Sequence, residues 1–206
     1  MVLLEVCIDD LGGARAALAG GAGRLEVCSR LDLGGLTPSP DLVRTLRNET
    51  GAPLFCMVRP RGGDFVPRGD DLARCVDDLE RVLDCGAHGV VYGWITADGR
   101  VDRPALEALV ARSRGVPATF HRAFEHVKNP VQELEVLIEC GIERVLTSGG
   151  ARDAHEGRFV LRELVEAARG RIRILPGGGV RAHNAAAIVA ATGVDEIHSS
   201  TVFSAP

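Results

Sequence analysis

The feature that most constrains the fold is a series of glycines that recur about every 30 residues. Each glycine closes a helical pattern and precedes a short apolar run. Glycine just past a helix is the expected C-terminal cap, because it adopts the left-handed backbone conformation easily. Each interval has the size of one strand followed by one helix. Together with a first strand at Leu3–Asp9, the pattern predicts eight strands, and its glycines are Gly21, Gly51, Gly86, Gly115, Gly141, Gly170 and Gly193.

Helix starts agree with this spacing. Ser39-Pro40, Asp102-Arg103-Pro104 and Asn129-Pro130 each place a capping side chain just before an early-turn proline. Strands that alternate with helices imply parallel pairing through right-handed crossovers. Eight such units predict a TIM-type (β/α)8 barrel. A doubly wound open sheet is the alternative, but no Gly-x-Gly-x-x-Gly follows the first strand.

Composition supports one soluble domain over residues 1–206. The hydrophobic share is 46% and the charged share 25%, which is ordinary for a globular protein. A net charge of −4 offers no broad basic surface, so we expect no nucleic-acid partner. An anionic ligand would therefore have to be bound by local cations.

The chain carries no sign of a membrane or secreted protein. The N-terminus lacks the basic start and long apolar region of a signal peptide, and no apolar tract is long enough to cross a bilayer. The six cysteines lie in apolar runs without a Cys-x-x-Cys pair, which favours reduced thiols in the cytoplasm. They are Cys7, Cys28, Cys56, Cys75, Cys85 and Cys140.

The predicted barrel lacks its last helix. The eighth strand, near Asp195–Ser200, leaves only six residues before the end of the sequence. The outward side chains Leu4, Val6, Ile8 and Ile197 would then be uncovered, at a cost of ~25 cal/mol per Å² of exposed apolar area. We therefore expect a homo-oligomer, with a dimer favoured, in which another subunit covers this face.

Several strands aim polar side chains at the barrel axis. Because side chains alternate along a strand, the inward set includes Glu5, Glu26, Arg59, His121 and His198. Barrel interiors are normally filled with Val, Ile and Leu, and buried charges need partners. The set is either a self-satisfied polar plug or a pocket for a ligand. Its position toward the C-terminal ends of the strands favours the pocket.

Three loops near those strand ends suit an anion. Arg59-Pro-Arg61-Gly-Gly-Asp64 follows the third strand, Thr147–Gly150 the sixth and Pro176–Val180 the seventh. Glycine-rich backbone can bind phosphate or carboxylate through exposed N–H groups, and arginines add charge. The first loop could also be a plain surface turn. The predicted anion-binding residues are Arg59, Arg61, Ser148, Gly149, Gly150, Gly177, Gly178 and His198.

A metal site is a further possibility. Cys7 and Cys28 face inward on neighbouring strands and so lie side by side. Two thiolates, with Met57 or a histidine nearby, suit a soft ion such as Cu(I) or Zn. Buried cysteine is also a common small core residue, and from the spacing alone the core interpretation is favoured.

The sequence resembles the CutC family over nearly its full length. It departs at Ile197-His-Ser-Ser200, where that family more often has His-Gly-Ser-Ala. The matching motifs are Glu5-Val-Cys7-Ile-Asp9, Gly21-Ala-Gly-Arg-Leu-Glu26-Val-Cys28-Ser29, Gly34-Gly-Leu-Thr-Pro-Ser39, Met57-Val-Arg-Pro-Arg-Gly-Gly-Asp-Phe65, Thr119-Phe-His-Arg-Ala-Phe124, Arg144-Val-Leu-Thr-Ser-Gly-Gly150 and Pro176-Gly-Gly-Gly-Val180.

The resemblance implies a cytoplasmic, oligomeric TIM-type barrel with a role in copper homeostasis. It also implies that Cys7 and Cys28 are Cu(I) ligands. The residues themselves support an alternative, an enzyme acting on a small anionic or phosphorylated metabolite, with Glu26, Arg59 and His121 as candidate catalytic residues. A scaffold whose outer surface matters more than its mouth is the third hypothesis.

Overall fold

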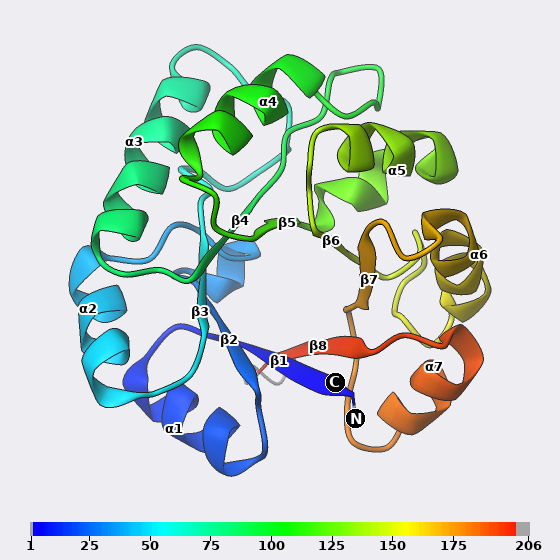
Figure 1. Cartoon of the computed structure of the whole chain (residues 1–206), viewed down its shortest axis with the longest axis horizontal. Helices are drawn as coiled ribbons and strands as arrows, with labels where there is room; N and C mark the ends of the chain where they lie inside the picture. Colours follow the sequence, from blue (N-terminus) through cyan, green and yellow to red (C-terminus); the bar gives the residue numbers. More distant parts are fainter. Residues whose placement is uncertain (1, 201–206) are drawn as a thin grey trace.

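Eight parallel strands form a TIM-type barrel in this computed structural model, which describes residues 2–200 (Figure 1). The hydrogen-bonded order is β7-β6-β5-β4-β3-β2-β1-β8, so β7 and β8 are the two ends of the sheet. Arg173 at the start of β7 joins them, because its Nη1 donates to Glu196 Oε1 of β8 at 2.9 Å. The strands are β1 (Leu3–Ile8), β2 (Arg24–Val27), β3 (Leu54–Met57), β4 (Gly89–Tyr92), β5 (Ala118–Phe120), β6 (Arg144–Thr147), β7 (Arg173–Pro176) and β8 (Glu196–Ser200).

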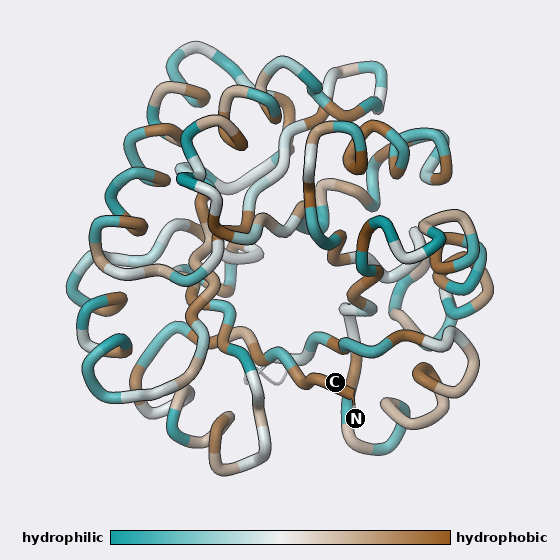
Figure 2. Tube along the Cα trace, viewed as in Figure 1, coloured by the Kyte–Doolittle hydropathy of each residue, from teal (hydrophilic) through white to brown (hydrophobic). Residues whose placement is uncertain are grey.

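Alternation along the strands separates two apolar regions, as predicted. Leu25 and Val27 of β2 belong to the large core between the sheet and the helices. Cys28, Phe55 and Met57 belong to a smaller cluster inside the barrel. In Figure 2 the strands are mostly hydrophobic, while the helices around them alternate between hydrophobic and hydrophilic faces.

Helices cover the outside of the barrel. The predicted caps form at two helices: Ser39 Oγ accepts from Leu42 N at 3.2 Å and Asp102 Oδ1 from Ala105 N at 3.1 Å. Asn129 also precedes its helix, but without a side-chain cap bond. The α-helices are α1 (Leu11–Ala19), α2 (Pro40–Glu49), α3 (Asp71–Asp84), α4 (Arg103–Arg112), α5 (Pro130–Glu139), α6 (Arg158–Ala168) and α7 (Ala185–Thr192), and the 3-10 helices are η1 (Leu31–Leu33) and η2 (Arg122–His126).

The glycine pattern is right at six positions and wrong at one. Gly21, Gly86, Gly115, Gly141, Gly170 and Gly193 all have the predicted positive φ. Gly51 does not, because Thr50 ends α2 instead: its N–H and its Oγ1 both donate to Leu46 O, at 3.0 and 2.8 Å. The carbonyl at that end of the helix is thus satisfied without a left-handed residue.

A buried ionic network fills the N-terminal end of the barrel. Arg24 of β2 bridges Glu5 of β1 and Glu196 of β8, and Arg144 Nε of β6 donates to Glu196 Oε2 at 3.2 Å. Both guanidinium groups also lie over the Phe55 ring, at 4.8 and 4.9 Å from its centroid. Pairing removes most of the cost of burying these charges, so the network fixes how the strands meet.

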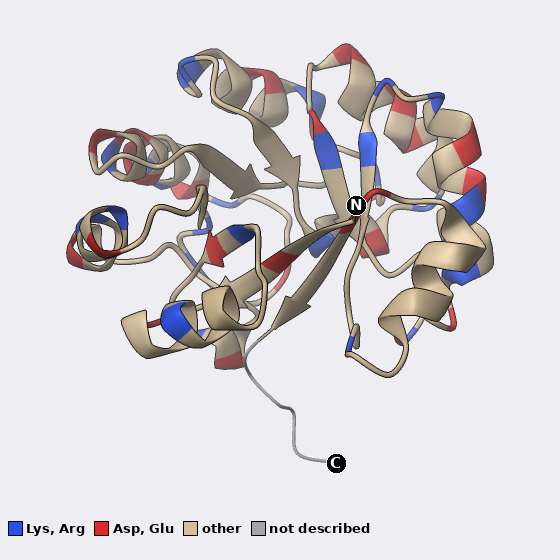
Figure 3. Cartoon of the chain, turned by 60° about the horizontal axis from the view of Figure 1, so that its bottom comes forward, with Lys and Arg blue, Asp and Glu red and all other residues tan. Residues whose placement is uncertain are grey.

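Charged residues of both signs lie on most of the helices, with further ones on the strands (Figure 3). Within residues 2–200 no helix is long and apolar enough to cross a membrane. The predicted lack of a closing helix after β8 concerns residues 201–206, which lie outside the described residues.

Candidate functional site

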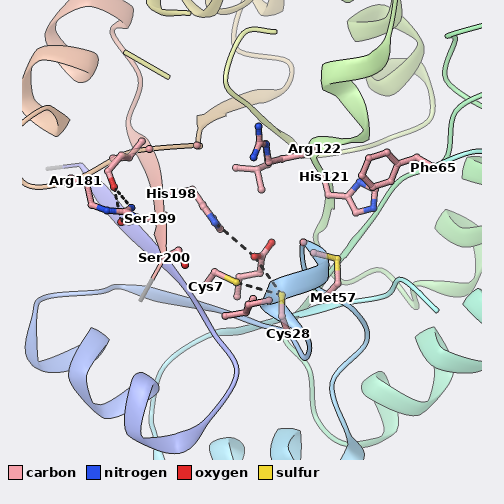
Figure 4. A pocket seen from close by; sticks show the side chains of 17 residues that line it. Cys7, Cys28, Met57, Phe65, His121, Arg122, Arg181, His198, Ser199 and Ser200 are labelled. Carbon is pink, nitrogen blue, oxygen red and sulfur yellow. Dashed lines mark hydrogen bonds and ion pairs between the residues drawn. The ribbon is translucent and has the colours of Figure 1, made fainter. Parts of the chain in front are cut away.

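A pocket of about 290 Å³ opens where the C-terminal ends of the strands meet (Figure 4). This is the end at which barrel enzymes carry their sites. Four of the predicted site residues gather in its lining: Cys7 of β1, Glu26 of β2, Cys28 directly after β2 and His198 of β8. The lining consists of Cys7, Glu26, Cys28, Leu31, Gly34, Met57, Phe65, His121, Arg122, Leu146, Gly178, Gly179, Val180, Arg181, His198, Ser199 and Ser200.

The two cysteines lie in contact, as predicted from their strands. Cys7 Sγ donates a weak hydrogen bond to Cys28 Sγ at 3.5 Å, and Cys28 Sγ lies 3.7 Å from Glu26 Oε2. The bond to Cys28 and burial raise the pKa of Cys7 well above its ordinary range. The bond from Cys7 lowers the pKa of Cys28, but burial and the Glu26 carboxyl outweigh it and raise that pKa to about 11. Both groups are therefore neutral thiols at pH 7.

His198 lies between two glutamates. Its Nδ1 donates to Glu5 Oε1 at 2.7 Å, and its Nε2 is 3.8 Å from Glu26 Oε2. Burial opposes charge on Glu5, but the His198 bond overcomes it and lowers the pKa of Glu5 to about 2. Burial likewise opposes the charge on His198, and the two carboxyl groups outweigh it and raise its pKa. A carboxylate that holds one ring nitrogen leaves the other free to act as a ligand.

Glu26 is the least satisfied polar group of the pocket. The residue is buried, and its Oε1 has no hydrogen-bond partner within the described part of the chain. Burial is the main cause that raises the pKa of Glu26. Cys7, Glu26 and His198 each offer a ligand atom, and these atoms lie within 4.8 Å of one another. The same corner of the pocket thus gathers sulfur, nitrogen and oxygen donors.

His121 lies on the opposite wall as a neutral imidazole. Its Nδ1 accepts from Ala123 N at 3.2 Å, so the ring proton is on Nε2. Burial and then the nearby Arg59 charge lower the pKa of His121 to about 3. The ring packs against Phe65, with centroids 4.9 Å apart. His121 can therefore donate a hydrogen bond to a ligand, but it does not hold a charge near pH 7.

The two arginines predicted to bind an anion bind the protein itself. Arg59 is buried outside the pocket lining and donates to the carbonyls of Leu33, Gly35 and Gly63 at 3.0, 3.2 and 2.7 Å. Its guanidinium also stacks on Phe65 at 4.5 Å. Arg61 Nε donates to Asp71 Oδ2 at 2.7 Å. The loop after β3 thus holds neighbouring loops together.

The glycine loop after β6 binds a carboxylate of the same chain. Ser148 N and Gly150 N donate to the two oxygens of Glu125, at 2.6 and 2.9 Å. Thr147 Oγ1 adds a third bond at 3.2 Å, and Gly149 N donates to that same hydroxyl at 2.9 Å. The predicted anion-binding geometry is present, and Glu125 from η2 occupies it.

The loop after β7 reaches the pocket. Gly177 N is used, donating to Thr147 O at 3.0 Å, while Gly178 and Gly179 line the cavity. Two arginines that were not among the predicted site residues lie nearby. Arg122 lies inside the Thr119–Phe124 motif, directly after His121, and Arg181 directly follows the Pro176–Val180 motif, so the sequence motifs are the signal that could have found both.

The family comparison agrees with the geometry. The model of the CutC family matches residues 2–203. A family protein CutC of Histophilus somni is 44% identical over 197 residues, covering 96% of this chain and 81% of that protein. A copper homeostasis protein cutC homolog of Mus musculus is 42% identical over 198 residues, covering 96% and 73%.

Solved structures show the same fold. A CutC crystal structure from Streptococcus agalactiae has a TM-score of 0.92 at 31% identity, covering 97% of this chain and 98% of that one. A deoxyribose phosphate aldolase of Aeropyrum pernix, at 14% identity and a TM-score of 0.69 over 95% of this chain and 84% of that one, shares the barrel alone. The chain belongs to the CutC family, whose named relatives are copper homeostasis proteins.

Proposed function

We propose that this chain binds one Cu(I) ion through Cys7 and Cys28, with His198 as the third ligand. The observation that carries the proposal is the contact of the two Sγ atoms at 3.5 Å at the base of a pocket. Thiolate and imidazole are donors that suit a soft copper ion. Cys7 and His198 belong to the group whose ligand atoms lie within 4.8 Å of one another, Cys28 adjoins it through Cys7, and Glu5 already orients the His198 ring.

Copper binding at this site requires the loss of protons. Thiolate is the ligand, and both thiol pKa values are raised. An ion that displaces the protons replaces the Sγ–Sγ hydrogen bond with two metal–sulfur bonds. Burial keeps water away from the bound ion. Reduced thiols of this kind are stable in the cytoplasm, which is the compartment we propose.

A competition titration tests the proposal. Reduced protein is titrated with Cu(I) against a chelator of known affinity, and the wild type is compared with Cys7→Ser and Cys28→Ser. We expect each variant to lose at least tenfold in affinity. Cys140→Ser is the matched control. Cys140 is also a buried cysteine, but it lies at the end of α5 and does not line the pocket. Equal copper affinity in all four proteins would sink the proposal.

A second function has its own observation in favour. The pocket lining includes two cations, Arg122 and Arg181, together with a carboxyl group and a neutral histidine, Glu26 and His121. This arrangement suits an enzyme that holds a small anionic metabolite and moves a proton on it. In this version Glu26 is the acid or base, since its pKa is raised, and His121 donates a hydrogen bond. Arg59 acts only indirectly, by positioning the loops around Phe65.

The two functions are separable by experiment. A Cu(I) site needs the sulfur atoms and is indifferent to the arginines, whereas an anion site needs the arginines. Loss of copper affinity in Cys7→Ser, with no change in Arg122→Gln, assigns the sulfur atoms to copper. Loss of copper affinity in Arg122→Gln, with no change in Cys7→Ser, would contradict the copper site and favour the metabolite-binding function.

A further inference from the structure

We infer that the loop after β7 is a phosphate site, formed by the backbone of Gly178 and Gly179 with the Arg122 guanidinium, and that it takes the phosphate of a small phosphomonoester. The inference deepens the second function above and rests on it. The phosphate site lies in a different part of the pocket from the copper ligands. Of the three loops whose sequence suits an anion, this is the one that still has donors to offer.

The other two candidate loops are occupied by the protein. The arginines after β3 bind loop carbonyls and Asp71. The N–H groups after β6 bind the Glu125 carboxylate. Neither loop can receive a ligand without breaking several of these hydrogen bonds, at about 1 kcal/mol for each.

The loop after β7 differs because its N–H groups are unused. In the described part of the chain the amides of Gly178 and Gly179 donate to no acceptor, and both residues line the pocket. Their φ values of +91° and +68° place them in the left-handed region, which only glycine adopts at little cost. Successive N–H groups in such a turn form a concave anion-binding surface.

Arg122 supplies the charge. Its Cζ and Nη2 lie 3.7 Å from the position that a Cβ on Gly178 would take. Its side chain is 50% exposed, and its ion pair with Glu125 is long, at 3.5 Å. The same Glu125 is tied to the loop after β6, so it keeps Arg122 beside Gly178 without using up its donors. Arg181, which also lines the pocket, adds a second positive charge (Figure 4).

A second feature points independently to a ligand. Glu26 is 97% buried, lines the same pocket, and has an oxygen without a hydrogen-bond partner. The Nε2–H of His121 is a donor on the facing wall. A phosphate at Gly178 and Gly179 would leave room for a small polar body between these two groups. Hydroxyl groups on that body would satisfy both, by donating to Glu26 Oε1 and accepting from His121 Nε2.

Calorimetric titration tests the inference, with inorganic phosphate, glycerol 3-phosphate and acetate as probes. We expect saturable phosphate binding in the low millimolar range or tighter, at least tenfold tighter than acetate. Glycerol 3-phosphate should bind at least as tightly as phosphate. Absence of saturable phosphate binding, or a preference for acetate, would overturn the site. Binding of phosphate without glycerol 3-phosphate would overturn the ligand class.

Variants locate the site. Arg122→Gln should weaken phosphate binding at least tenfold, and Arg162→Gln should leave it unchanged. Arg162 is the matched control, since it is an exposed arginine paired with a glutamate on α6. Gly178→Ala should also weaken binding, and thermal unfolding shows whether the variant stays folded. An unchanged affinity in Arg122→Gln would contradict the inference.

Copper measurements on the same proteins keep the two proposals apart. Cys7→Ser should bind phosphate like the wild type, since no cysteine takes part. Failure of the phosphate site would leave the copper titration unaffected, and failure of the copper site would leave phosphate binding intact. Phosphate binding that requires bound copper would contradict the separation drawn here.

Discussion

The chemistry of the site depends on a few side chains whose pKa values are far from ordinary. Both pocket thiols are neutral at pH 7, Glu5 is a firm carboxylate, and His121 is a neutral imidazole. These states follow from burial and from the identity of each neighbour. From these protonation states we predict how copper affinity and folding stability depend on pH.

Copper affinity should rise with pH. Two thiol protons leave when Cu(I) binds, so the apparent affinity should increase at least about a hundredfold per pH unit near neutrality. His198, whose pKa is raised, must also lose a proton before it can bind the ion, which makes the rise steeper. Competition titrations at several pH values measure this, after correction for the chelator. Cys28→Ser, with one thiol fewer, should show a shallower rise. An affinity independent of pH would mean that thiolates are not the ligands.

Folding stability should fall in acid because of His121. Its pKa is lowered to about 3 in the folded protein, so below the ordinary histidine value near 6.5 the unfolded chain binds a proton that the folded chain rejects. The loss is about 1.4 kcal/mol per pH unit between these two values. Chemical denaturation between pH 6.5 and 5 should show this slope in the wild type. An equally steep slope in His121→Gln would assign the effect to another group.

Prediction from sequence reached the right strands but not every side-chain partner. Inward placement of Glu26, Cys28 and His198 followed from alternation, which is a local rule. The partners of Arg59 could not be foreseen, because they are carbonyls of loops distant in the sequence. Glu125 could not be predicted for the same reason, because the sequence around it does not indicate that η2 lies against the loop after β6.

At the scale of helices and strands, features set by neighbouring residues could also be predicted better than features set by distant ones. Helix starts are encoded in three or four residues, and two of the three predicted caps form. Gly51 failed as a cap because Thr50 satisfies the end of α2 first, which the glycine pattern does not register.

The caps allow a matched test of helix stability. Asp102→Ala removes a side-chain bond to Ala105 N and should cost about 0.5–2 kcal/mol in the free energy of unfolding. Asn129→Ala occupies the same cap position of α5 but removes no such bond, so it should cost less. Chemical denaturation of both variants measures the difference. Equal losses would mean that capping bonds do not account for these helix starts.

At the scale of the whole molecule, one face of the barrel has an apolar groove. It lies between α1 and α7, and small residues of α1 line it. The prediction that the outward side chains would be uncovered is wrong for three of the four: Ile8, Val6 and Ile197 are buried at 0%, 7% and 8% exposure, and only Leu4 is half-buried. We propose that a second copy of the chain covers this groove in a homodimer, because the groove lining is mainly apolar.

Light scattering at micromolar concentration tests the dimer. Ala16→Arg places a charged side chain in the groove from an exposed position of α1 and should yield monomers. Ala19→Arg, exposed on the same helix but outside the groove lining, should leave the dimer intact. A wild type that is monomeric at these concentrations would refute the proposal.

The barrel itself could be predicted because it repeats one local unit eight times, whereas its interior combines all strands at once. Arg24 and Arg144 start β2 and β6, and only the closed barrel brings both onto Phe55. The pocket above this network is likewise a property of the assembled barrel. In the proposed function, Cys7, Cys28 and His198 hold a copper ion in this pocket.

X-ray absorption at the copper edge of the Cu(I)-loaded protein tests that claim most directly, because it counts the sulfur neighbours of the metal. We predict two sulfur ligands and one nitrogen ligand in the wild type. Cys7→Ser should show one sulfur ligand, and His198→Ala should lose the nitrogen. A copper ion with only nitrogen and oxygen neighbours, or one whose spectrum is the same in Cys7→Ser, would contradict the account.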